Sequence, residues 1–337
     1  MTTQPQPGAL TLIAKKTGNF ILEYMVLVAI VILVAVTAIV ATDINGQRIF
    51  FTEQNLTNLM RQFGPLSFLA LGLTFVIIAQ FIDLSAPGII ALSAYSALML
   101  VDVIGEGPAI IAGLLVGTAL GLLNAVLIIK SGATTQAKAL FVTFGMSTIY
   151  LSVTLIMRQG QTIDRSFIQH EMPITQFISR GMVGPFTLTF AAFILFVIVL
   201  LIFERKTVMG RAVRYTGGNI LAAELGGLPT KKVIILVYAL CGLMAAVCAL
   251  VLFSRVPVVT PGMGRFFERD AILAVVVGGT SLVGGRGSVL RTVLGVTLIT
   301  LMSNCMNLLA INPIMQEILR GGILVLAIWL DHRRHRG

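Results

Sequence analysis

The chain has 337 residues, of which 57% are hydrophobic and 11% are charged, and its formal net charge is +10 at pH 7. Soluble domains carry roughly 25% charged residues because their surface has to be solvated. The composition therefore disfavours a soluble enzyme, a disordered chain and a nucleic-acid-binding module. It predicts an integral, multi-pass membrane protein, in which the basic excess belongs to cytoplasmic loops.

Apolar runs of about 20 residues are long enough to cross a bilayer. The runs that meet this length are, in chain order, Ile21–Ala41, Leu66–Ile82, Pro108–Ile129, Ala139–Met157, Phe186–Phe203, Val233–Phe253, Ser288–Leu309 and Pro313–Leu330. Two shorter runs, Gly88–Val101 and Ala271–Gly279, each lie beside a break that contains glycine or aspartate. We predict an all-α, polytopic membrane helical bundle of about ten apolar segments, eight of them full spans and two short or broken. An eight-span bundle with two re-entrant segments is the alternative.

Both chain ends are predicted to be cytoplasmic. Lys15 and Lys16 precede the first apolar run, which is longer than the core of a signal peptide and lacks a small-x-small cleavage site after it, so we expect an uncleaved first helix. With ten spans, most Lys and Arg residues fall on the side of the N-terminus, as the positive-inside rule requires. The predicted parts are a cytoplasmic tail (1–20), a single transmembrane domain (21–330) with a cytoplasmic loop (204–232), and a basic cytoplasmic tail (331–337).

The two breaks carry the strongest functional signal among the apolar segments. One contains Asp83 and Ser85, and the other contains Thr280 and Ser281. Non-helical backbone at membrane depth is tolerated where it is buried in protein or lines a water-filled cavity. One break in each half of the chain indicates a weak internal repeat and makes these four residues candidates for a transport pathway or its gate. The alternative is that Asp83 or Ser85 caps the helix that follows.

Amide and small residues inside the spans have two interpretations. Asn124, Asn304 and Asn307 offer neutral hydrogen-bonding groups to a sugar pathway, although such amides more often bond to a neighbouring helix. The segment Gly113–Gly121 has glycine at every fourth position. This small-xxx-small ladder predicts close helix packing.

The loop 204–232 contains a predicted short helix. Asn219 is a good N-cap, Ala222–Leu225 favours helix, and the Gly-Gly pair that begins at Gly226 ends it. A short helix between glycines on the cytoplasmic face predicts a docking element. The alternative is a solvated basic loop near anionic lipid.

Three blocks of the sequence, in the expected order, resemble those of the permease subunits of ribose-type carbohydrate ABC importers, a branch related to branched-chain amino-acid permeases. These blocks are Gln80–Gly88, Gly210–Gly226 and Asp270–Ser288, of which the last is nearly complete. The resemblance implies that the second block couples the permease to an ATPase. Its matching residues are Gly210, Arg211, Gly217, Gly218, Asn219, Ala222, Ala223 and Gly226.

The resemblance also implies a mechanism and partners. Two permeases, copies or paralogues, form a dimer in the bacterial inner (cytoplasmic) membrane, an ABC ATPase docks on the loop 204–232, and a periplasmic binding protein delivers a small neutral sugar. ATP and Mg are expected on the ATPase and no cofactor on this chain, which lacks the Gly-x-x-x-x-Gly-Lys-Ser/Thr phosphate loop. Three basic residues predicted to lie outside are candidates for docking the binding protein: Arg255, Arg265 and Arg269.

Other functions fit the residues less well. An ion-coupled secondary transporter typically needs intramembrane carboxylates, and the nearest candidates are Asp83, Asp270 and Glu317. A membrane-embedded enzyme or metal site is disfavoured because no metal-ligand spacing falls inside a span and the cysteines lie in apolar runs. A branched-chain amino-acid permease has a related pattern, but Asp83–Ser85 and Thr280–Leu282 favour a sugar.

Overall fold

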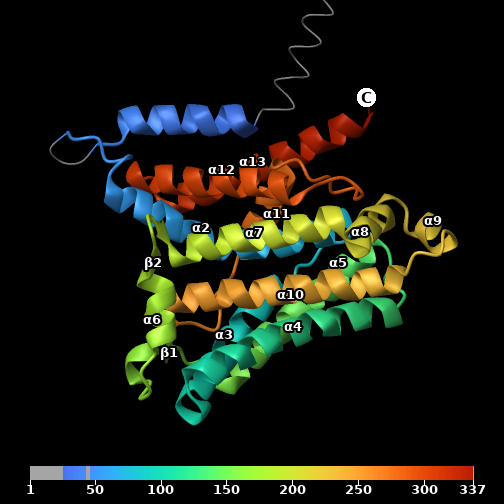
Figure 1. Cartoon of the computed structure of the whole chain (residues 1–337), viewed down its shortest axis with the longest axis horizontal. Coiled ribbons are helices and arrows are strands. Elements are labelled where there is room, and N and C mark those ends of the chain that lie inside the picture. The colour runs from blue at the N-terminus through green and yellow to red at the C-terminus, as the bar shows by residue number, and fades with distance from the viewer. Residues whose placement is uncertain (1–25, 43–45, 337) are drawn as a thin grey trace, which may run out of the picture.

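In the computed structural model, which describes residues 26–42 and 46–336, the chain folds into a bundle of helices (Figure 1). The first described helix is Val26–Val40. The longer helices that follow are α2 (Glu53–Ile78), α3 (Ala86–Ile104), α4 (Glu106–Lys130), α5 (Gln136–Met157), α7 (Leu188–Lys206), α10 (Thr230–Arg255), α12 (Val289–Leu308) and α13 (Pro313–Arg336). The shorter ones are η1 (Arg165–Phe167), α6 (Pro173–Arg180), α8 (Val208–Gly218), α9 (Ile220–Leu225) and α11 (Phe267–Val277). Short antiparallel strands pair β1 (Ile163–Asp164) with β4 (Val258–Val259) and β2 (Met182–Val183) with β3 (Phe186–Thr187).

Seven of the described helices are long and apolar enough to cross a membrane, namely α2, α3, α4, α5, α7, α10 and α12. Apart from α3, each of them covers all or most of a run predicted as a full span. The prediction that Gly88–Val101 is a short segment is wrong, because α3 begins at Ala86 and continues through Asp102 to Ile104, a length of 19 residues. The chain is therefore a multi-pass membrane protein, as its composition predicts.

The remaining predicted segments take other forms. Val26–Val40 is the described part of the first predicted run, while residues 21–25, the predicted tail 1–20 and residue 337 lie outside the described residues. The second short run corresponds to α11, which has 11 residues. The last run begins α13, a helix of 24 residues that extends into the predicted tail 331–337.

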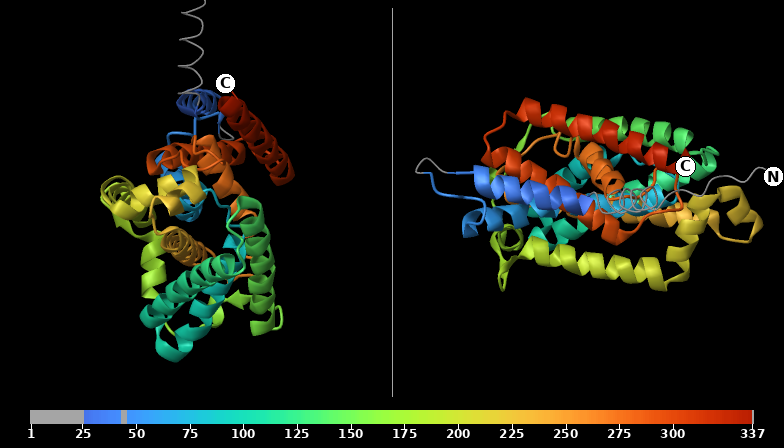
Figure 2. Two further views of the ribbon diagram at one scale, coloured as in Figure 1. Left: turned by 90° about the vertical axis from the view of Figure 1, so that its right-hand side faces the viewer. Right: turned by 90° about the horizontal axis from the view of Figure 1, so that it is seen from above.

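Helix α2 lies at the centre of the bundle. It packs against α7, α10, α11 and α12, and nearly all of its residues from Phe63 to Ile78 are buried. On one side α10 packs against α3 and α4, and α5 packs against α3 (Figures 1 and 2). The part of α2 from Phe63 to Ile78 contains no charged residue and is apolar on nearly all sides, which suits it to the interior of the bundle.

The glycine ladder of α4 allows close helix packing, as predicted. A β-carbon on Gly113 would lie 2.9 Å from Cβ of Ala97 in α3, and one on Gly121 would lie 2.3 Å from the carbonyl oxygen of Tyr238 in α10. Helix α10 contributes a matching small residue, Gly242, where a β-carbon would lie 2.3 Å from a carbonyl oxygen of α4. Larger side chains would push α4 away from both neighbours, so these glycines set the helix spacing.

The bundle has two different ends. Helices α8 and α9 (208–225) protrude at one of them, which we call the α9 end; residues 158–187, with α6, cover the opposite or α6 end (Figure 1). At the α6 end the Glu106 carboxylate accepts hydrogen bonds of 2.7 Å from the first-turn amides of α6 at Ile174 and Thr175. Nearby, burial lowers the pKa of Arg165, whose guanidinium donates to Thr175 Oγ1. The connections at this end are thus fixed by specific polar contacts.

Candidate functional site

The first break, residues 79–85, is held by a buried polar network. Asp83 Oδ1 accepts hydrogen bonds from the Ser85 amide (2.9 Å) and hydroxyl (2.6 Å). Ser85 Oγ accepts from Asn124 Nδ2 of α4 (2.7 Å), and Asn124 Oδ1 accepts from the Tyr150 hydroxyl of α5 (2.9 Å). All of these side chains are at most 2% exposed. Three of the predicted pathway residues therefore meet in one closed cluster, which ties the break to α4 and α5.

Two hydroxyl groups that no sequence pattern singles out also form hydrogen bonds with the first break. Thr143 Oγ1 of α5 accepts from the Leu84 amide at 3.1 Å, and the Tyr238 hydroxyl of α10 donates to the Ile82 carbonyl oxygen at 3.3 Å. Both bonds satisfy backbone groups that the break leaves without a helical partner. The only sequence signal for them is a hydroxyl residue inside an apolar run, which is too common to identify a partner.

The second break, residues 278–288, is a glycine-rich loop between α11 and α12. Thr280 and Ser281 are buried in it, and the Ser281 amide donates to the Arg286 carbonyl oxygen at 3.0 Å. Several of its glycines adopt positive φ angles that residues with a side chain rarely take. They include Gly279 (101°), Gly284 (87°) and Gly285 (70°). The two predicted residues thus lie within a turn of the loop itself.

The two breaks meet at the end of α8. The Gly285 amide donates a 2.8 Å hydrogen bond to the carbonyl oxygen of Ile78, the last residue of α2. Gly217 of α8 packs onto the same oxygen, since a β-carbon there would lie 1.7 Å from it. A β-carbon on Gly284 would in turn lie 2.5 Å from the Gly217 carbonyl oxygen. Direct backbone contact therefore joins α8 to both breaks.

The loop 204–232 contains two helices, and the prediction of a short capped helix is confirmed. Asn219 Oδ1 accepts from the Ala222 amide at 2.9 Å at the start of α9, and Gly226 forms its C-cap. Gly210 belongs to α8, where a β-carbon would lie 2.3 Å from the carbonyl oxygen of Phe203 in α7. The loop therefore folds into a defined structure, and its first residues pack closely against the end of α7.

Helix α9 protrudes from the bundle (Figure 2) and carries exposed apolar side chains. Leu221 and Leu225, one turn apart, are 63% and 83% exposed, whereas Ala223 between them is buried. Arg211 is exposed on α8, and among the described residues no atom beyond its own stretch of helix lies within 4 Å of the β-carbon position of Gly218. An exposed apolar pair on a short, fixed helix is the kind of surface that a partner protein covers.

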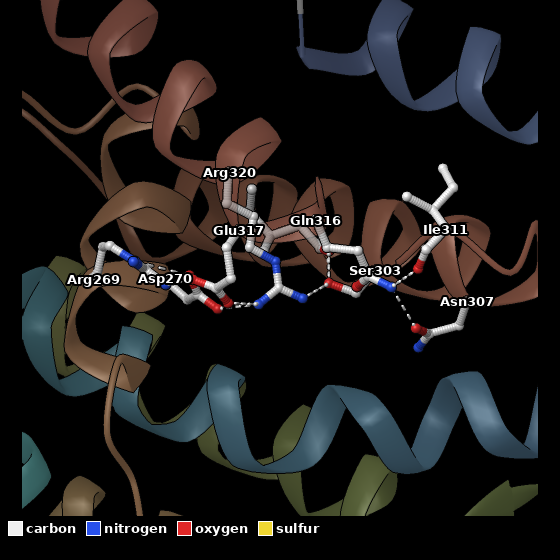
Figure 3. Close-up of polar contacts among 9 residues, drawn as sticks. Arg269, Asp270, Ser303, Asn307, Ile311, Gln316, Glu317 and Arg320 are labelled. Carbon is white, nitrogen blue, oxygen red and sulfur yellow. Dashed lines mark hydrogen bonds and ion pairs between the residues drawn. The ribbon is translucent and has the colours of Figure 1, made fainter. Parts of the chain in front are cut away.

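The amides of α12 bond to neighbouring helices. Asn304 Nδ2 donates to Asn55 Oδ1 of α2 at 2.9 Å, and Asn55 Nδ2 donates back to Asn304 Oδ1 at 3.3 Å. Asn307 Oδ1 accepts from Gln316 Nε2 of α13 at 3.0 Å (Figure 3). The structure therefore places both predicted amides in contacts between helices and apart from the Asp83 cluster.

The three arginines predicted to dock a partner differ in their surroundings. Arg255 and Arg265 are exposed. Arg269 is bonded to Glu317 of α13, and its guanidinium lies 4.8 Å from the ring centroid of Phe266. Figure 3 shows Arg269 directed toward the bundle and joined to its carboxylate partners. Its charge is therefore already paired.

A charged cluster connects α11, α12 and α13. Arg320 Nη1 lies 2.8 Å from Asp270 Oδ2, and Arg320 Nη2 donates to Ser303 Oγ at 3.0 Å (Figure 3). Glu317 contacts Arg269 and lies 3.7 Å from Arg320. Two of the three carboxylates named as candidates for ion coupling, Asp270 and Glu317, thus have arginine partners, an arrangement suited to holding helices together.

Comparison with known proteins gives these features a context. The family model described as "Branched-chain amino acid transport system / permease component" matches residues 55–328. The chain is 29% identical to the ribose import permease protein RbsC of Escherichia coli K12, with 99% of this chain and 100% of that protein covered. It is 32% identical to RbsC of Bacillus subtilis (85% and 87% covered) and 29% identical to the fructose import permease protein FrcC of Rhizobium meliloti (90% and 84% covered). No solved structure gives a significant match.

Proposed function

The chain belongs to the family of branched-chain amino acid transport system permease components, and we propose that it is the permease subunit of an ATP-driven importer of a small neutral sugar. The similarity to ribose import permeases along nearly the whole chain carries this proposal. It includes both breaks and the loop 204–232, the parts that a transport subunit needs. The family description names branched-chain amino acids, so leucine is the rival substrate to test.

The proposed ATPase docks on α9. The exposed Leu221 and Leu225 support this assignment, because apolar side chains at the end of a membrane bundle need a protein partner to leave water. ATP and Mg are bound by the ATPase, and this chain supplies the surface through which nucleotide-driven movement reaches the membrane. The contact of Gly217 with Ile78 gives that movement a direct route to both breaks.

The proposed orientation places the α9 end and both termini in the cytoplasm and the α6 end in the periplasm. Basic residues gather at the α9 end, as expected for the cytoplasmic side of a bacterial inner membrane. They include Arg205, Lys206, Arg211, Arg214, Lys231 and Lys232. In this arrangement Val26–Val40, α11 and α13 complete the seven longer helices to give ten membrane segments.

The proposed periplasmic binding protein docks at the α6 end. Arg255 and Arg265 are exposed and have no carboxylate partner among the described residues, although Arg255 Nη1 donates to the Arg61 carbonyl oxygen at 2.6 Å. Arg269 has a carboxylate partner within this chain. A second permease copy or paralogue completes the membrane dimer, and the pathway lies between the helices that carry the breaks.

The proposed pathway opens at the polar residues of the breaks. In the present conformation Asp83, Ser85 and Asn124 bond to one another, and Thr280 and Ser281 are buried. Alternating access requires a second conformation in which polar groups of this region exchange protein partners for sugar hydroxyls. Asn304 and Asn307 would affect how far α12 moves in this change, through their contacts with α2 and α13.

A reconstituted transport assay tests the proposal. The permease is placed in proteoliposomes with its cognate ATPase and binding protein, and uptake of radiolabelled ribose, xylose, fructose and leucine is measured with ATP inside. We expect uptake of one sugar that requires both ATP and the binding protein. Uptake driven by a sodium or proton gradient without ATP, or uptake of leucine alone, would overturn it.

A further inference from the structure

A basic cavity lies at the α9 end, between the end of α7, helix α8 and the second break. Its volume is about 520 Å³. The lining residues are Glu204, Arg205, Arg214, Gly285, Arg286, Gly287, Ser288 and Arg291. Four arginines and one glutamate thus surround a single space, at the point where α12 begins.

The one carboxylate that lines the cavity, Glu204, already has an ion-pair partner and a hydrogen-bond partner. Glu204 Oε1 lies 2.7 Å from Arg214 Nη2, and Glu204 Oε2 accepts from the Val289 amide at 3.0 Å in the first turn of α12. Arg291 Nη1 donates to the Gly279 carbonyl oxygen at 3.1 Å, which leaves most of its positive charge uncompensated. Among the described side chains, three of the four arginine charges therefore have no carboxylate partner at this site.

Arg205 and Arg286 have the most available guanidinium groups. Among the residues whose side chains the structure describes, neither group has a hydrogen-bond or ion-pair partner, and both arginines are exposed. Guanidinium groups bind phosphate oxygens through paired, charge-assisted hydrogen bonds. Arginines on two sides of one cavity, on α7 and on the second break, fit a phosphate group placed between them.

The apolar surface beside the cavity indicates the source of that phosphate. Along α7, Leu195, Ile198, Val199 and Ile202 are 49% to 59% exposed and form one stripe at helical spacing that leads to Arg205. A soluble phosphate would make no contact with this stripe, whereas the acyl chains of a lipid would pack along it.

We propose that this cavity binds the phosphate headgroup of an anionic phospholipid from the cytoplasmic leaflet. The headgroup lies between Arg205 and Arg286 with Arg291 nearby, and the acyl chains run along the exposed stripe of α7. Basic pockets at the cytoplasmic ends of membrane helices recognise lipid headgroups in this manner. The inference depends on the membrane orientation and not on the identity of the transported solute.

A bound headgroup would connect segments that take part in the proposed movement between the ATPase and the membrane helices. Arg286 belongs to the loop whose Gly285 amide contacts Ile78, and Arg214 belongs to the same helix as Gly217. A headgroup between Arg205 and Arg286 would therefore hold the second break against the end of α7, which the pair of Glu204 and Arg214 joins to α8.

The test uses the full-length permease in detergent, with bound lipid counted by native mass spectrometry during titration with phosphatidylglycerol or phosphatidylcholine. We expect tighter binding of phosphatidylglycerol, a loss of about fivefold in affinity for Arg205→Gln or Arg286→Gln, and about 25-fold for the double variant. Lys231→Gln removes a positive charge at the same end of the bundle but outside the cavity, and is the matched control. Millimolar inorganic phosphate should leave phosphatidylglycerol bound.

Each other outcome has a defined meaning. Equal binding of the two lipids, or unchanged binding to the double variant, would overturn the proposal. Displacement by inorganic phosphate would support an anion site but identify a soluble ligand in place of the lipid. If the double variant binds phosphatidylglycerol normally and instead loses the ATPase, the arginines contact that partner and the lipid site is refuted.

Discussion

Gly217 of α8 approaches Ile78 of α2 so closely that a β-carbon on Gly217 would lie 1.7 Å from the Ile78 carbonyl oxygen. The same oxygen accepts the hydrogen bond of the Gly285 amide. Three segments far apart in the sequence thus share one backbone group. Because packed backbone cannot be compressed, a displacement of α8 toward this oxygen must move α2, the second break or both.

We expect Gly217→Ala to destabilise the permease by about 1–3 kcal/mol, because the methyl group forces α8 away from α2. ATP-dependent uptake should be lost with it. Gly218→Ala is the control, since its β-carbon position has no neighbouring atom within 4 Å. Thermal unfolding of the two variants in detergent measures the difference, and equal unfolding temperatures would contradict this account of the contact.

Replacing Leu221 and Leu225 by serine should abolish co-purification of the ATPase while leaving the unfolding temperature unchanged. Both side chains are exposed, so the bundle loses little packing, whereas an interface anchor of this kind contributes about 2 kcal/mol. Val183→Ser, at an exposed apolar position of the α6 end, is the matched control. Undiminished recovery of the ATPase with the double variant would remove α9 as the docking element.

The sequence alone identifies features that depend on local rules. Asn219 and Gly226 mark α9, and the glycine ladder marks a close helix contact, because capping and small-residue spacing act within a few residues. The start of α2 was missed: the predicted run begins at Leu66, but the helix begins at Glu53. Thr52 caps it by accepting from the Asn55 amide, a signal hidden by the polar residues of its first turns.

Contacts between distant segments could not be read from the sequence. Asn124 stands out as an amide in an apolar run. Its partners are Ser85 in the first break and Tyr150 on α5, and no periodicity reveals how these segments are placed around α4. The pairing of Asn304 with Asn55 is likewise a property of the assembled bundle. Such pairings require the fold, because any polar group inside the bundle has several possible neighbours.

The Asp83 cluster should behave as a network in stability measurements. Asn124→Ala removes the amide that links Ser85 to Tyr150, which costs about 1–3 kcal/mol, and Tyr150→Phe costs about 1 kcal/mol. The double variant should lose less than the two single variants together, because they remove one shared interaction. Unfolding in denaturing detergent provides the three values. Strict additivity would show that the bonds are independent and would contradict the network.

The pair of Asp270 and Arg320 should be structural. Arg320→Met leaves the Asp270 carboxylate without its shorter arginine contact and should cost about 2 kcal/mol, whereas Asp270→Asn combined with Arg320→Met should recover much of that loss. Uptake by the double variant should keep its dependence on ATP and remain insensitive to collapse of the proton gradient. If uptake by the unaltered protein depends on the proton gradient and the double variant loses that dependence, the result would instead support the ion-coupled alternative.

The orientation can be tested by cysteine labelling, because the native Cys241, Cys248 and Cys305 are all buried. Phe167 at the α6 end and Leu225 at the α9 end are 82% and 83% exposed, so a cysteine at either position is accessible from its own side. In intact cells with a permeable outer membrane, a membrane-impermeant maleimide should label Phe167→Cys at once. Leu225→Cys, in a strain without the ATPase that would cover α9, should react only after the inner membrane is opened. Labelling of both cysteines before the inner membrane is opened would contradict the proposed orientation. The reverse order of labelling would contradict it as well, because the positive charge at the α9 end would then face the periplasm, against the usual bias of membrane proteins.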